Sequence, residues 1–448
     1  MRHDRHSLVV LSSRLPFDGD DGSGMLSSGG LVSALAPILR SRSGVWIGQT
    51  RSPLTAPTID GVAVRSLDID PDEFGRHCEG FCASTLWPLY HDMVVPAEFD
   101  RTWWDAYRSV NARFAQAADD AAGFGATVWV HDYHLQLVPE MLRSQRPDVR
   151  IGFFNHLPFP PKELFAQLPS RTAIAEGMLR ADVIGFQLDS DAQNFRSCAL
   201  AFSDIDVDRS ETVLDSFPMS IDVPAIHDCA ESPTTALQAR ELRAQFGAPE
   251  TLLLGIDRLE HTKGILQRLL AYEELLEEGA LDPRSTTLVQ TAVPAEDEPP
   301  TQTELRDEAE QLVGRINGRF GTLATTVIHY CHRSYSFETL VALYLAADVL
   351  LATSLRDGMN LIAKEYVAAR RGRSGVLVLS EFAGSAGELT QALSVNPHDA
   401  DALKHQMSEA VHMPAETARR HMDAMAAVVD SNDGHQWAER FLHAVESG

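Results

Sequence analysis

The sequence predicts an α/β protein of two domains, each built around a parallel sheet. Its 448 residues are more than one hydrophobic core usually organises. Short apolar runs alternate along the chain with longer stretches whose apolar residues recur every three or four positions. This alternation is typical of parallel strands connected by helices. Such folds bind ligands at the carboxyl ends of their strands, so we look for function in the residues that follow each strand.

Nine short apolar runs are predicted to form strands, and three longer stretches have the periodicity of helices. Loops are predicted at 18–30, where Gly, Ser and Asp cluster, and in the acidic, proline-containing segment 294–303. The predicted strands are residues 8–11, 127–130, 151–155, 183–186, 252–256, 286–291, 327–329, 349–352 and 375–379, and the predicted helices are 135–145, 304–318 and 337–347.

The pattern breaks at residues 221–235, which contain two prolines and show no apolar periodicity. We therefore predict a first domain at 1–221 and a second at 222–428. In the remaining segment, 429–448, Trp437, Phe441 and Val445 recur every four residues after an Asp-Gly turn. This spacing predicts a C-terminal helix that docks one apolar face back across the domains.

The composition excludes several classes of partner. Asp and Glu number 63 against 38 Lys and Arg, giving a formal net charge of −25. This balance argues against nucleic acid or an anionic membrane as the main partner, so any anionic ligand requires a local cluster of cations. The five cysteines show no disulfide or zinc spacing, and no apolar run is long enough to span a bilayer. The sequence predicts a cytoplasmic protein with reduced thiols.

Two cations follow a predicted strand in segment 255–264, where Arg258 and Lys263 are five residues apart. Arg offers a planar fork of donors and Lys a point charge, and together they suit a diphosphate. Two surface cations flanking a turn are the alternative.

A second turn follows the strand at 349–352. Arg356, Asp357 and Gly358 read as the turn, and Met359 onward reads as a helix whose first N–H groups form an anion site. Glu365, two turns into that helix, can accept hydrogen bonds from a ribose. A capping Asp and a solvated Glu are the alternative.

Polar residues also follow two strands of the first half. Asp132 lies directly after a hydrophobic strand, where it can bind sugar hydroxyls, and His156 follows the next strand. A hydrogen-bonded turn and a structural histidine are the alternatives.

These segments, with Trp46 in 44–48 and Trp87 in 86–90, resemble the trehalose-6-phosphate synthase family. That family comprises retaining glycosyltransferases of the GT-B architecture, with two Rossmann-like domains and the active site in the cleft between them. The similarity runs nearly end to end, through residues 12–14, 28–31, 315–321, 376–384 and 395–397.

The resemblance implies a role for each candidate residue. Arg258 and Lys263 would bind the diphosphate of a nucleotide-sugar donor and stabilise it as it leaves, with no metal and no other cofactor. His156 and Asp132 would lie at the reacting sugar. The remaining donor contacts would be Gly30, which lets a loop close over the diphosphate, Asp357 at the sugar, Asn360 and Leu361 through their backbone, and Glu365 at the ribose. The acceptor contacts would be Arg14, Trp46, Cys78, Trp87, Asp132 and Glu296.

Two acceptor positions depart from the family. Cys78 stands where members have a tyrosine, and Glu296 stands where they have an arginine, both contacts to the acceptor phosphate, whereas Arg14 is retained. Two unit charges 4 Å apart interact by about 4 kcal/mol at an effective dielectric constant near 20. We therefore expect a non-phosphorylated acceptor, such as a cation, amine or thiol, and a setting in antibiotic or other specialised-metabolite biosynthesis.

Three alternatives stay open from the sequence. The first is a trehalose-6-phosphate synthase that uses glucose 6-phosphate. The others are a catalytically silent sugar-phosphate sensor and a pseudo-glycosyltransferase that couples cyclitols. The donor base (UDP or GDP), the donor sugar beyond a hexose, and assembly into a homo-oligomer also stay open.

Overall fold

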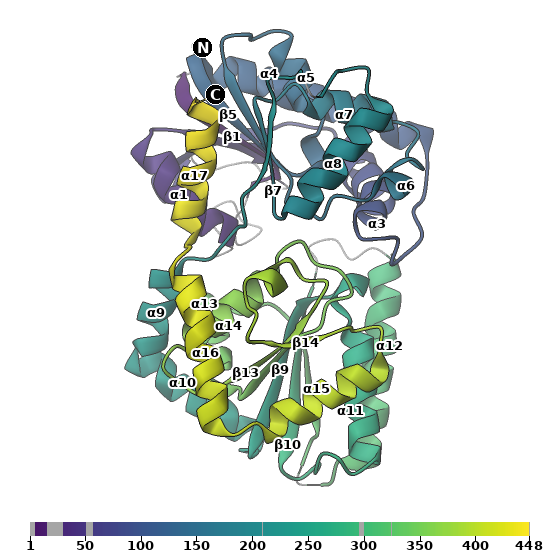
Figure 1. The fold of residues 1–448 in the computed structure, drawn as a ribbon, viewed down its shortest axis with the longest axis vertical. Helices are drawn as coiled ribbons and strands as arrows, with labels where there is room; N and C mark the ends of the chain where they lie inside the picture. The colour runs from purple at the N-terminus through teal and green to yellow at the C-terminus, as the bar shows by residue number, and fades with distance from the viewer. Residues whose placement is uncertain are drawn as a thin grey trace. The chain divides into compact units, whose positions relative to one another are not determined.

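The computed structural model describes residues 5–15, 30–50, 57–207, 209–294, 300–323 and 325–447. The chain divides into two compact units (Figure 1). Unit 1 comprises residues 1–219 together with 434–448, and unit 2 comprises residues 220–433. The chain thus passes from one unit to the other at 219–220 and again at 433–434.

Unit 1 contains an eight-stranded sheet in the order β3-β4-β2-β1-β5-β6-β7-β8. Every neighbouring pair is parallel except the antiparallel β3–β4 pair. The strands are β1 (His6–Arg14), β2 (Val45–Gln49), β3 (Thr58–Ile59), β4 (Val62–Leu67), β5 (Ala122–His131), β6 (Arg150–Phe154), β7 (Val183–Phe186) and β8 (Val213–Ser216).

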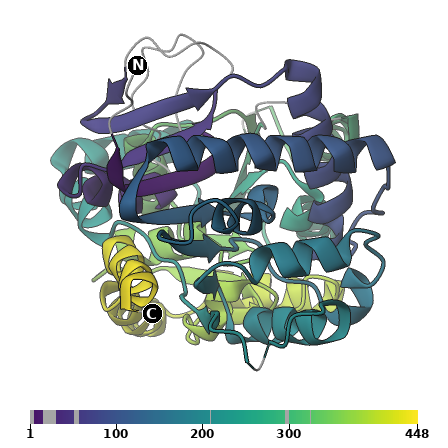
Figure 2. The same ribbon diagram turned by 90° about the horizontal axis from the view of Figure 1, so that it is seen from above.

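Helices cover this sheet, and the longest of them, α4, runs along it in Figure 2. Asp100 caps α4 by accepting a hydrogen bond from the backbone N–H of Thr102. The helices are α1 (Gly30–Ser41), α2 (Pro71–Gly75), a π-helix (Arg76–Leu86), α3 (Trp87–Tyr90), α4 (Arg101–Ala121), a 3₁₀ turn (Tyr133–Leu135), α5 (Val138–Arg143), α6 (Lys162–Phe165), α7 (Arg171–Met178), α8 (Asp189–Phe202) and α17 (Gly434–Ser447).

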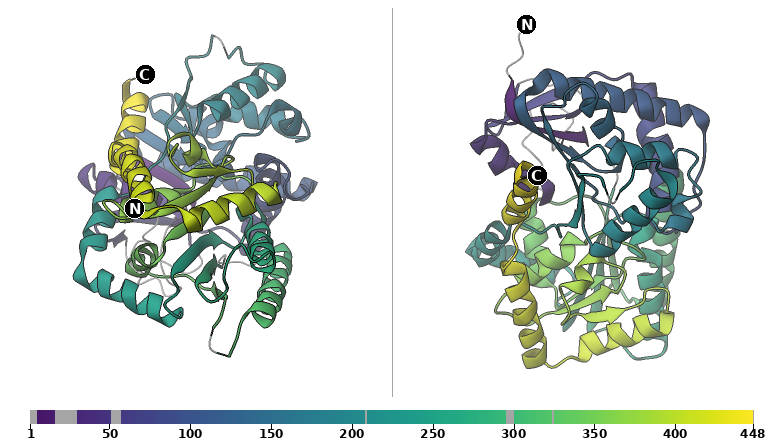
Figure 3. Two further views of the ribbon diagram at one scale, coloured as in Figure 1. Left: turned by 60° about the horizontal axis from the view of Figure 1, so that its bottom comes forward. Right: turned by 45° about the horizontal axis from the view of Figure 1, so that its top comes forward.

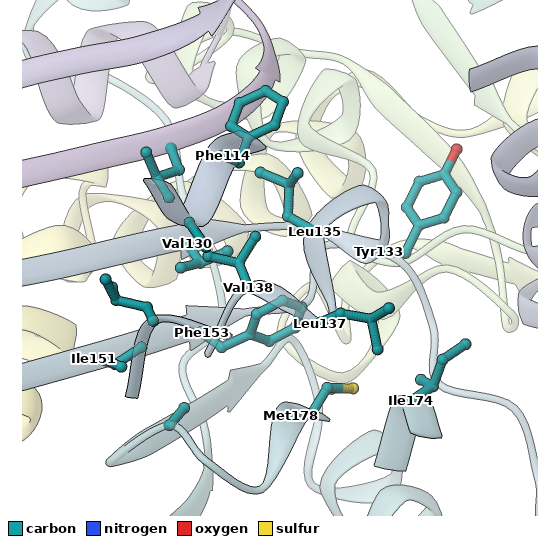
Figure 4. Packing of buried hydrophobic residues seen from close by; sticks show 14 of the residues in the cluster. Phe114, Val130, Tyr133, Leu135, Leu137, Val138, Ile151, Phe153, Ile174 and Met178 are labelled. Atoms are coloured by element: carbon teal, nitrogen blue, oxygen red, sulfur yellow. The ribbon is translucent and has the colours of Figure 1, made fainter. Parts of the chain in front are cut away.

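The core of unit 1 lies between the central strands and the helices that cover them. Figure 4 shows Val130, Ile151 and Phe153 from the strands packing against Phe114 of α4 and Val138 of α5. These strands are apolar along their whole length because both faces of a parallel sheet are covered.

Unit 2 contains a six-stranded parallel sheet in the order β11-β10-β9-β12-β13-β14. Figure 3 shows α15 and α16 following one another along this unit. Its elements are α9 (Val223–Glu231), α10 (Pro233–Gln245), β9 (Thr251–Arg258), a 3₁₀ turn (His261–Lys263), α11 (Ile265–Glu277), β10 (Thr286–Val293), α12 (Pro300–Phe320), β11 (Ile328–His332), α13 (Phe337–Ala346), β12 (Val349–Ala352), α14 (Leu361–Ala369), β13 (Val376–Ser380), a 3₁₀ turn (Gly384–Gly387), β14 (Leu393–Val395), α15 (Ala400–His412) and α16 (Ala415–Asp430).

The predicted α/β class with two parallel sheets is confirmed, and all nine predicted strands are present. A C-terminal helix is present at Gly434–Ser447, with Trp437, Phe441 and Val445 buried in unit 1. That it docks across the domains stays a prediction. Two predictions of irregular structure are wrong. Residues 223–245 form α9 and α10, because their prolines occupy first-turn positions where no N–H is needed. Helix α12 begins at Pro300, inside the predicted loop 294–303.

Candidate active site

The candidate donor residues of unit 2 lie at the carboxyl ends of β9 and β12, two adjacent strands. Arg258 is the last residue of β9; its side chain is 63% exposed and lies 3.1 Å from a carboxylate oxygen of Glu260. Lys263 ends the 3₁₀ turn that follows. Its Nζ lies 2.6 Å from Oδ2 of Asp357, in the loop after β12, and both side chains are mostly buried. The two segments identified in the sequence therefore meet through this ion pair.

The backbone around Lys263 is held tightly against the loop after β12. Gly264 has a φ of 64°, and a Cβ atom there would lie 2.3 Å from the carbonyl oxygen of Thr353. Glycine is the residue that meets both demands. The carbonyl of Thr262 accepts the backbone N–H of Leu355 at 2.7 Å. The position of Lys263 is thus fixed by its neighbours on both sides.

A fully buried arginine, Arg268, is hydrogen-bonded to this loop. Arg268 donates to Asp257 Oδ2 at 2.6 Å, to Gln290 at 2.7 Å and to Thr353 Oγ1 at 3.1 Å. It also donates to the carbonyl of Lys263 at 3.3 Å. A buried charge needs such partners. Arg268 was not a candidate from the sequence, because it resembles an ordinary helix residue. The signal that could have identified it is a basic residue within an apolar stretch of the helix.

Asn360 caps α14 by accepting the backbone N–H of Ala363 at 3.0 Å. Its Nδ2 donates to Asp357 Oδ2 at 3.2 Å. The helix therefore begins at Leu361, and its cap is Asn360. Asp357, which the sequence offered as an alternative cap, lies about one turn earlier. The first N–H groups of a helix have no partner within it, so this end of α14 is suited to an anion.

Glu365 lies further along α14, where it accepts a 2.7 Å hydrogen bond from the hydroxyl of Tyr344. Burial raises the pKa of Glu365. Burial also raises the pKa of Tyr344 well above its ordinary value, so the phenol keeps its proton and remains the donor. Tyr344, on α13, was not a sequence candidate, because 21 residues separate the partners.

In unit 1, Asp132 follows β5 with a φ of 73°, unusual for a residue other than glycine. Its backbone N–H donates to the carbonyl of Phe154 at 2.7 Å, and its Oδ1 accepts the backbone N–H of His156 at 3.2 Å. The structure therefore brings the two predicted unit 1 residues together. His131, which precedes Asp132, forms a 3.0 Å hydrogen bond to the ring of His156.

A second group in unit 1 surrounds Arg14 at the end of β1. The guanidinium lies 5.5 Å from the ring centre of Phe74 and interacts with the thiol of Cys78. The Cys78 sulfur also lies 3.5 Å from Oγ of Ser13. Burial raises the pKa of Cys78 to about 11, so the thiol is neutral at physiological pH. Cys78 is thus a neutral neighbour of a retained cation.

Three other predicted residues lie on other elements of unit 1. Trp46 is fully buried in β2 and donates its indole N–H to Ser12 at 2.8 Å. Trp87 begins α3 and packs its ring 4.4 Å from that of His91. Gly30 begins α1. Glu296 lies outside the described residues. The substrate contacts assigned to these residues stay predictions.

Within the described ranges, no group of three or more His, Cys, Asp and Glu side chains is arranged to hold a metal ion. Over the same ranges, every helix is too short or too polar to cross a membrane.

Comparison with known proteins identifies the family. The model of glycosyltransferase family 20 matches residues 8–447. The trehalose-6-phosphate synthase of Mycolicibacterium gilvum is 45% identical over 98% of this chain and 93% of its own. A structure from E. coli bound with UDP-2-fluoro glucose is 30% identical, with a TM-score of 0.90 over 98% of this chain and 99% of the other. The chain belongs to glycosyltransferase family 20 and is a glycosyltransferase with the GT-B fold.

The expectation of a non-phosphorylated acceptor is wrong. Relatives that match 98% of the chain are trehalose-6-phosphate synthases. A UDP-forming α,α-trehalose-phosphate synthase from Burkholderia xenovorans is known in complex with glucose 6-phosphate. It is 29% identical, with a TM-score of 0.88 over 98% of this chain and 99% of its own.

The error has a physical cause. Two substituted contacts were taken to decide the acceptor, although the interaction of Glu296 depends on its distance from the phosphate, which the sequence does not give. Arg14, the remaining cation, is in place, and the thiol of Cys78 beside it adds no opposing charge. The expected setting in antibiotic biosynthesis depended on the changed acceptor and has no other support.

Proposed function

We propose that this chain is a trehalose-6-phosphate synthase that transfers glucose from UDP-glucose to glucose 6-phosphate. The bond from the glucose anomeric carbon to the diphosphate breaks, and a bond to the anomeric oxygen of glucose 6-phosphate forms. UDP departs with the hydroxyl proton. The acceptor attacks from the face that the diphosphate leaves, so the anomeric configuration is retained. The observation that carries the proposal is 45% identity to a trehalose-6-phosphate synthase over 98% of the chain.

The geometry of unit 2 supports its assignment to the donor. Arg258, Lys263 and the N-terminus of α14 offer positive charge at the carboxyl ends of β9 and β12. Charge grows on the diphosphate as it leaves, so fixed cations stabilise the transition state more than the bound donor. In the protein without ligand, the ammonium of Lys263 is paired with the carboxylate of Asp357. The ammonium of Lys263 has three N–H donors, so it can bind the diphosphate beside this carboxylate.

Unit 1 supports binding of the sugars. Asp132 and His156 are held together by the hydrogen bond between the Asp132 carboxylate and the His156 backbone. Arg14 is the retained cation that would bind the acceptor phosphate, and Cys78 beside it is neutral. Retention of Arg14 is consistent with a phosphorylated acceptor.

The test measures release of UDP from UDP-glucose with and without glucose 6-phosphate, and mass spectrometry identifies the product. GDP-glucose as donor and unphosphorylated glucose as acceptor complete the comparison. We expect trehalose 6-phosphate from UDP-glucose and glucose 6-phosphate. Lys263→Ala should lower kcat by about a hundredfold or more, the usual effect of removing one transition-state donor. Arg284→Ala removes an exposed cation that pairs with Asp282 and should leave kcat unchanged.

Two results would contradict the proposal. One is the absence of a disaccharide phosphate with glucose 6-phosphate and either donor. The other is an equal loss of activity in Lys263→Ala and Arg284→Ala, which would show that the loop of Lys263 has no special role.

A further inference from the structure

The imidazoles of His131 and His156 are hydrogen-bonded to each other at the carboxyl ends of β5 and β6. Nδ1 of His131 and Nε2 of His156 are 3.0 Å apart. The ring planes differ by 16°, and the ring centres are 5.3 Å apart. The centres are separated by the nitrogen–nitrogen distance plus roughly two ring radii, so the nitrogens point at each other. This is the geometry of a straight N–H···N hydrogen bond.

Both rings are neutral at physiological pH. Burial lowers the pKa of His131 well below its ordinary value, and the proximity of His156 lowers it further. Burial lowers the pKa of His156 to about 3. The surroundings explain why, because the rings of Trp129, Phe154 and Trp437 pack against the pair. The nearby carboxylate of Asp132 accepts the backbone N–H of His156 rather than a ring N–H.

A neutral imidazole has one N–H and one lone pair, so the pair can be arranged in two ways. In the first, His131 carries its proton on Nδ1 and donates it to His156, whose own proton then lies on Nδ1. In the second, His156 carries its proton on Nε2 and donates it to His131, whose own proton then lies on Nε2. The two arrangements differ in what each histidine offers at its other nitrogen.

The free nitrogen of His131 distinguishes the two arrangements. Nε2 of His131 is buried and has no hydrogen-bond partner among the described residues. The first arrangement leaves a lone pair there, whereas the second leaves a buried N–H without an acceptor. Buried N–H groups without an acceptor are rare in proteins, and under-satisfied acceptors are somewhat less rare. The first arrangement places its unpartnered N–H on Nδ1 of His156 instead, which is not among the fully buried atoms that lack a partner and can therefore donate to water. The first arrangement should therefore be favoured.

We propose that His131 holds His156 in the tautomer with its proton on Nδ1, so that His156 presents an N–H donor, and not a base, to the sugar. The assignment of His156 to the sugar rests on the proposed function. The tautomer is set in the protein without substrate and does not depend on the proposed function. Nδ1 of His156 forms no hydrogen bond to a described residue, which leaves it available to a ligand. His131 is a positioning residue in this scheme, since it acts through His156.

Nuclear magnetic resonance can test the tautomer without substrate. The full-length protein is labelled with ¹⁵N-histidine, and long-range ¹H–¹⁵N spectra are recorded at pH 7.5. Signals are assigned by their loss in His131→Asn and His156→Asn. We expect a protonated Nδ1 and an accepting Nε2 for His156. A protonated Nε2 on His156 would overturn the proposal, and this result would be independent of any enzymatic activity.

Variants of His131 test its role in fixing the tautomer. His131→Asn keeps a side-chain N–H near the position of Nδ1, so His156 should stay in one tautomer. His131→Leu removes the donor, and His156 should then show signals averaged between both tautomers. If His156 remains wholly Nδ1-protonated in His131→Leu while the protein stays folded, its other surroundings fix the tautomer and His131 does not.

Variants of His156 test the donor function in the reaction. The amide nitrogen of Asn can lie near the position of Nδ1, and that of Gln near Nε2. We expect His156→Asn to retain kcat/KM within about tenfold, while His156→Gln and His156→Leu lose about a hundredfold, a typical effect of one hydrogen-bond donor to a transition state. Activity in Gln equal to or above that in Asn would contradict the proposal. If the wild-type enzyme lacks synthase activity, the proposed function fails and the spectra still decide the tautomer.

Discussion

Mild acid should destabilise unit 1 strongly, because four of its histidines have a lowered pKa. The pKa of His134 and that of His156 each fall to about 3, and those of His77 and His131 lie well below the ordinary value of 6.5; burial is the main cause in each case. Below pH 6.5 the unfolded chain binds protons that the folded unit excludes. Stability is therefore present above pH 6.5 and is lost as the pH falls toward the folded pKa values.

The size of the effect follows from proton linkage. Each such histidine lowers the free energy of unfolding by about 1.4 kcal/mol between pH 7.5 and 5.5, because its imidazole becomes protonated in the unfolded chain over that range. Four of them lose about 5 kcal/mol, which is comparable to the whole stability of many domains. Asp and Glu side chains in water stay ionised over this range. The depressed pKa of Asp148, which arises mainly from its hydrogen bond to Arg146, therefore adds nothing until lower pH.

Tryptophan fluorescence can follow unit 1 alone, since unit 2 contains no tryptophan in its sequence. The free energy of unfolding in urea would be measured at pH 7.5, 6.5 and 5.5. The six tryptophans are Trp46, Trp87, Trp103, Trp104, Trp129 and Trp437.

His77→Phe is a matched control for this titration. The His77 ring stacks on Tyr107, and both ring nitrogens are buried without a partner in the described part of the chain. Phe can keep the packing and cannot titrate, so the loss between pH 7.5 and 5.5 should shrink by about 1.4 kcal/mol. A wild-type loss below about 1.4 kcal/mol, the share of one histidine, would refute the reasoning.

Three substitutions test other buried contacts. Tyr344→Phe removes the hydroxyl that donates to Glu365. A buried acceptor that loses its partner costs about 1–3 kcal/mol, so KM for UDP-glucose should rise roughly tenfold with little change in kcat. Arg268→Met leaves Asp257 buried without its cation and should destabilise unit 2 by about 3–5 kcal/mol. Hydrogen exchange measures this loss, because unit 2 has no tryptophan, and a stability within about 1 kcal/mol of wild type would contradict the prediction. Trp437→Phe leaves a buried carbonyl unpaired and should cost about 1–3 kcal/mol, measured by calorimetry, and an unchanged melting temperature would count against this.

Much of the fold could be predicted because strands covered on both faces are apolar along their length. The runs at 252–256 and 349–352 are examples, and β9 and β12 are found there. Strand β4 was missed because residues 62–67 alternate buried and partly exposed positions in a short segment. The helices at 223–245 were missed because proline was interpreted only as a breaker, although the first turn of a helix accepts it.

The candidate site could be predicted only in part. Residues such as Lys263 and Asp357 follow strands and belong to recognisable segments, so the sequence located them. Their supports did not stand out, because hydrogen bonds such as that between Tyr344 and Glu365 join residues far apart in the sequence. His131 was adjacent to a candidate and was still passed over, because sequence gives the residue type but not the tautomer or the burial that defines its role.

Candidate residues on both sheets depend on buried neighbours that cannot themselves reach a ligand. The loop of Lys263 rests on Arg268, and the ring of His156 is hydrogen-bonded to His131. Each support is almost fully buried, so its hydrogen bonds have few alternatives and hold the supported group in one orientation. A group aligned before the substrate arrives need not be reorganised as the diphosphate leaves, and this is the condition under which fixed donors lower the barrier most. It follows that substituting a support should lower kcat more than it raises KM wherever the supported group acts on the transition state. Where the supported group binds only the ground state, as we expect for Glu365 beneath Tyr344, KM should change instead.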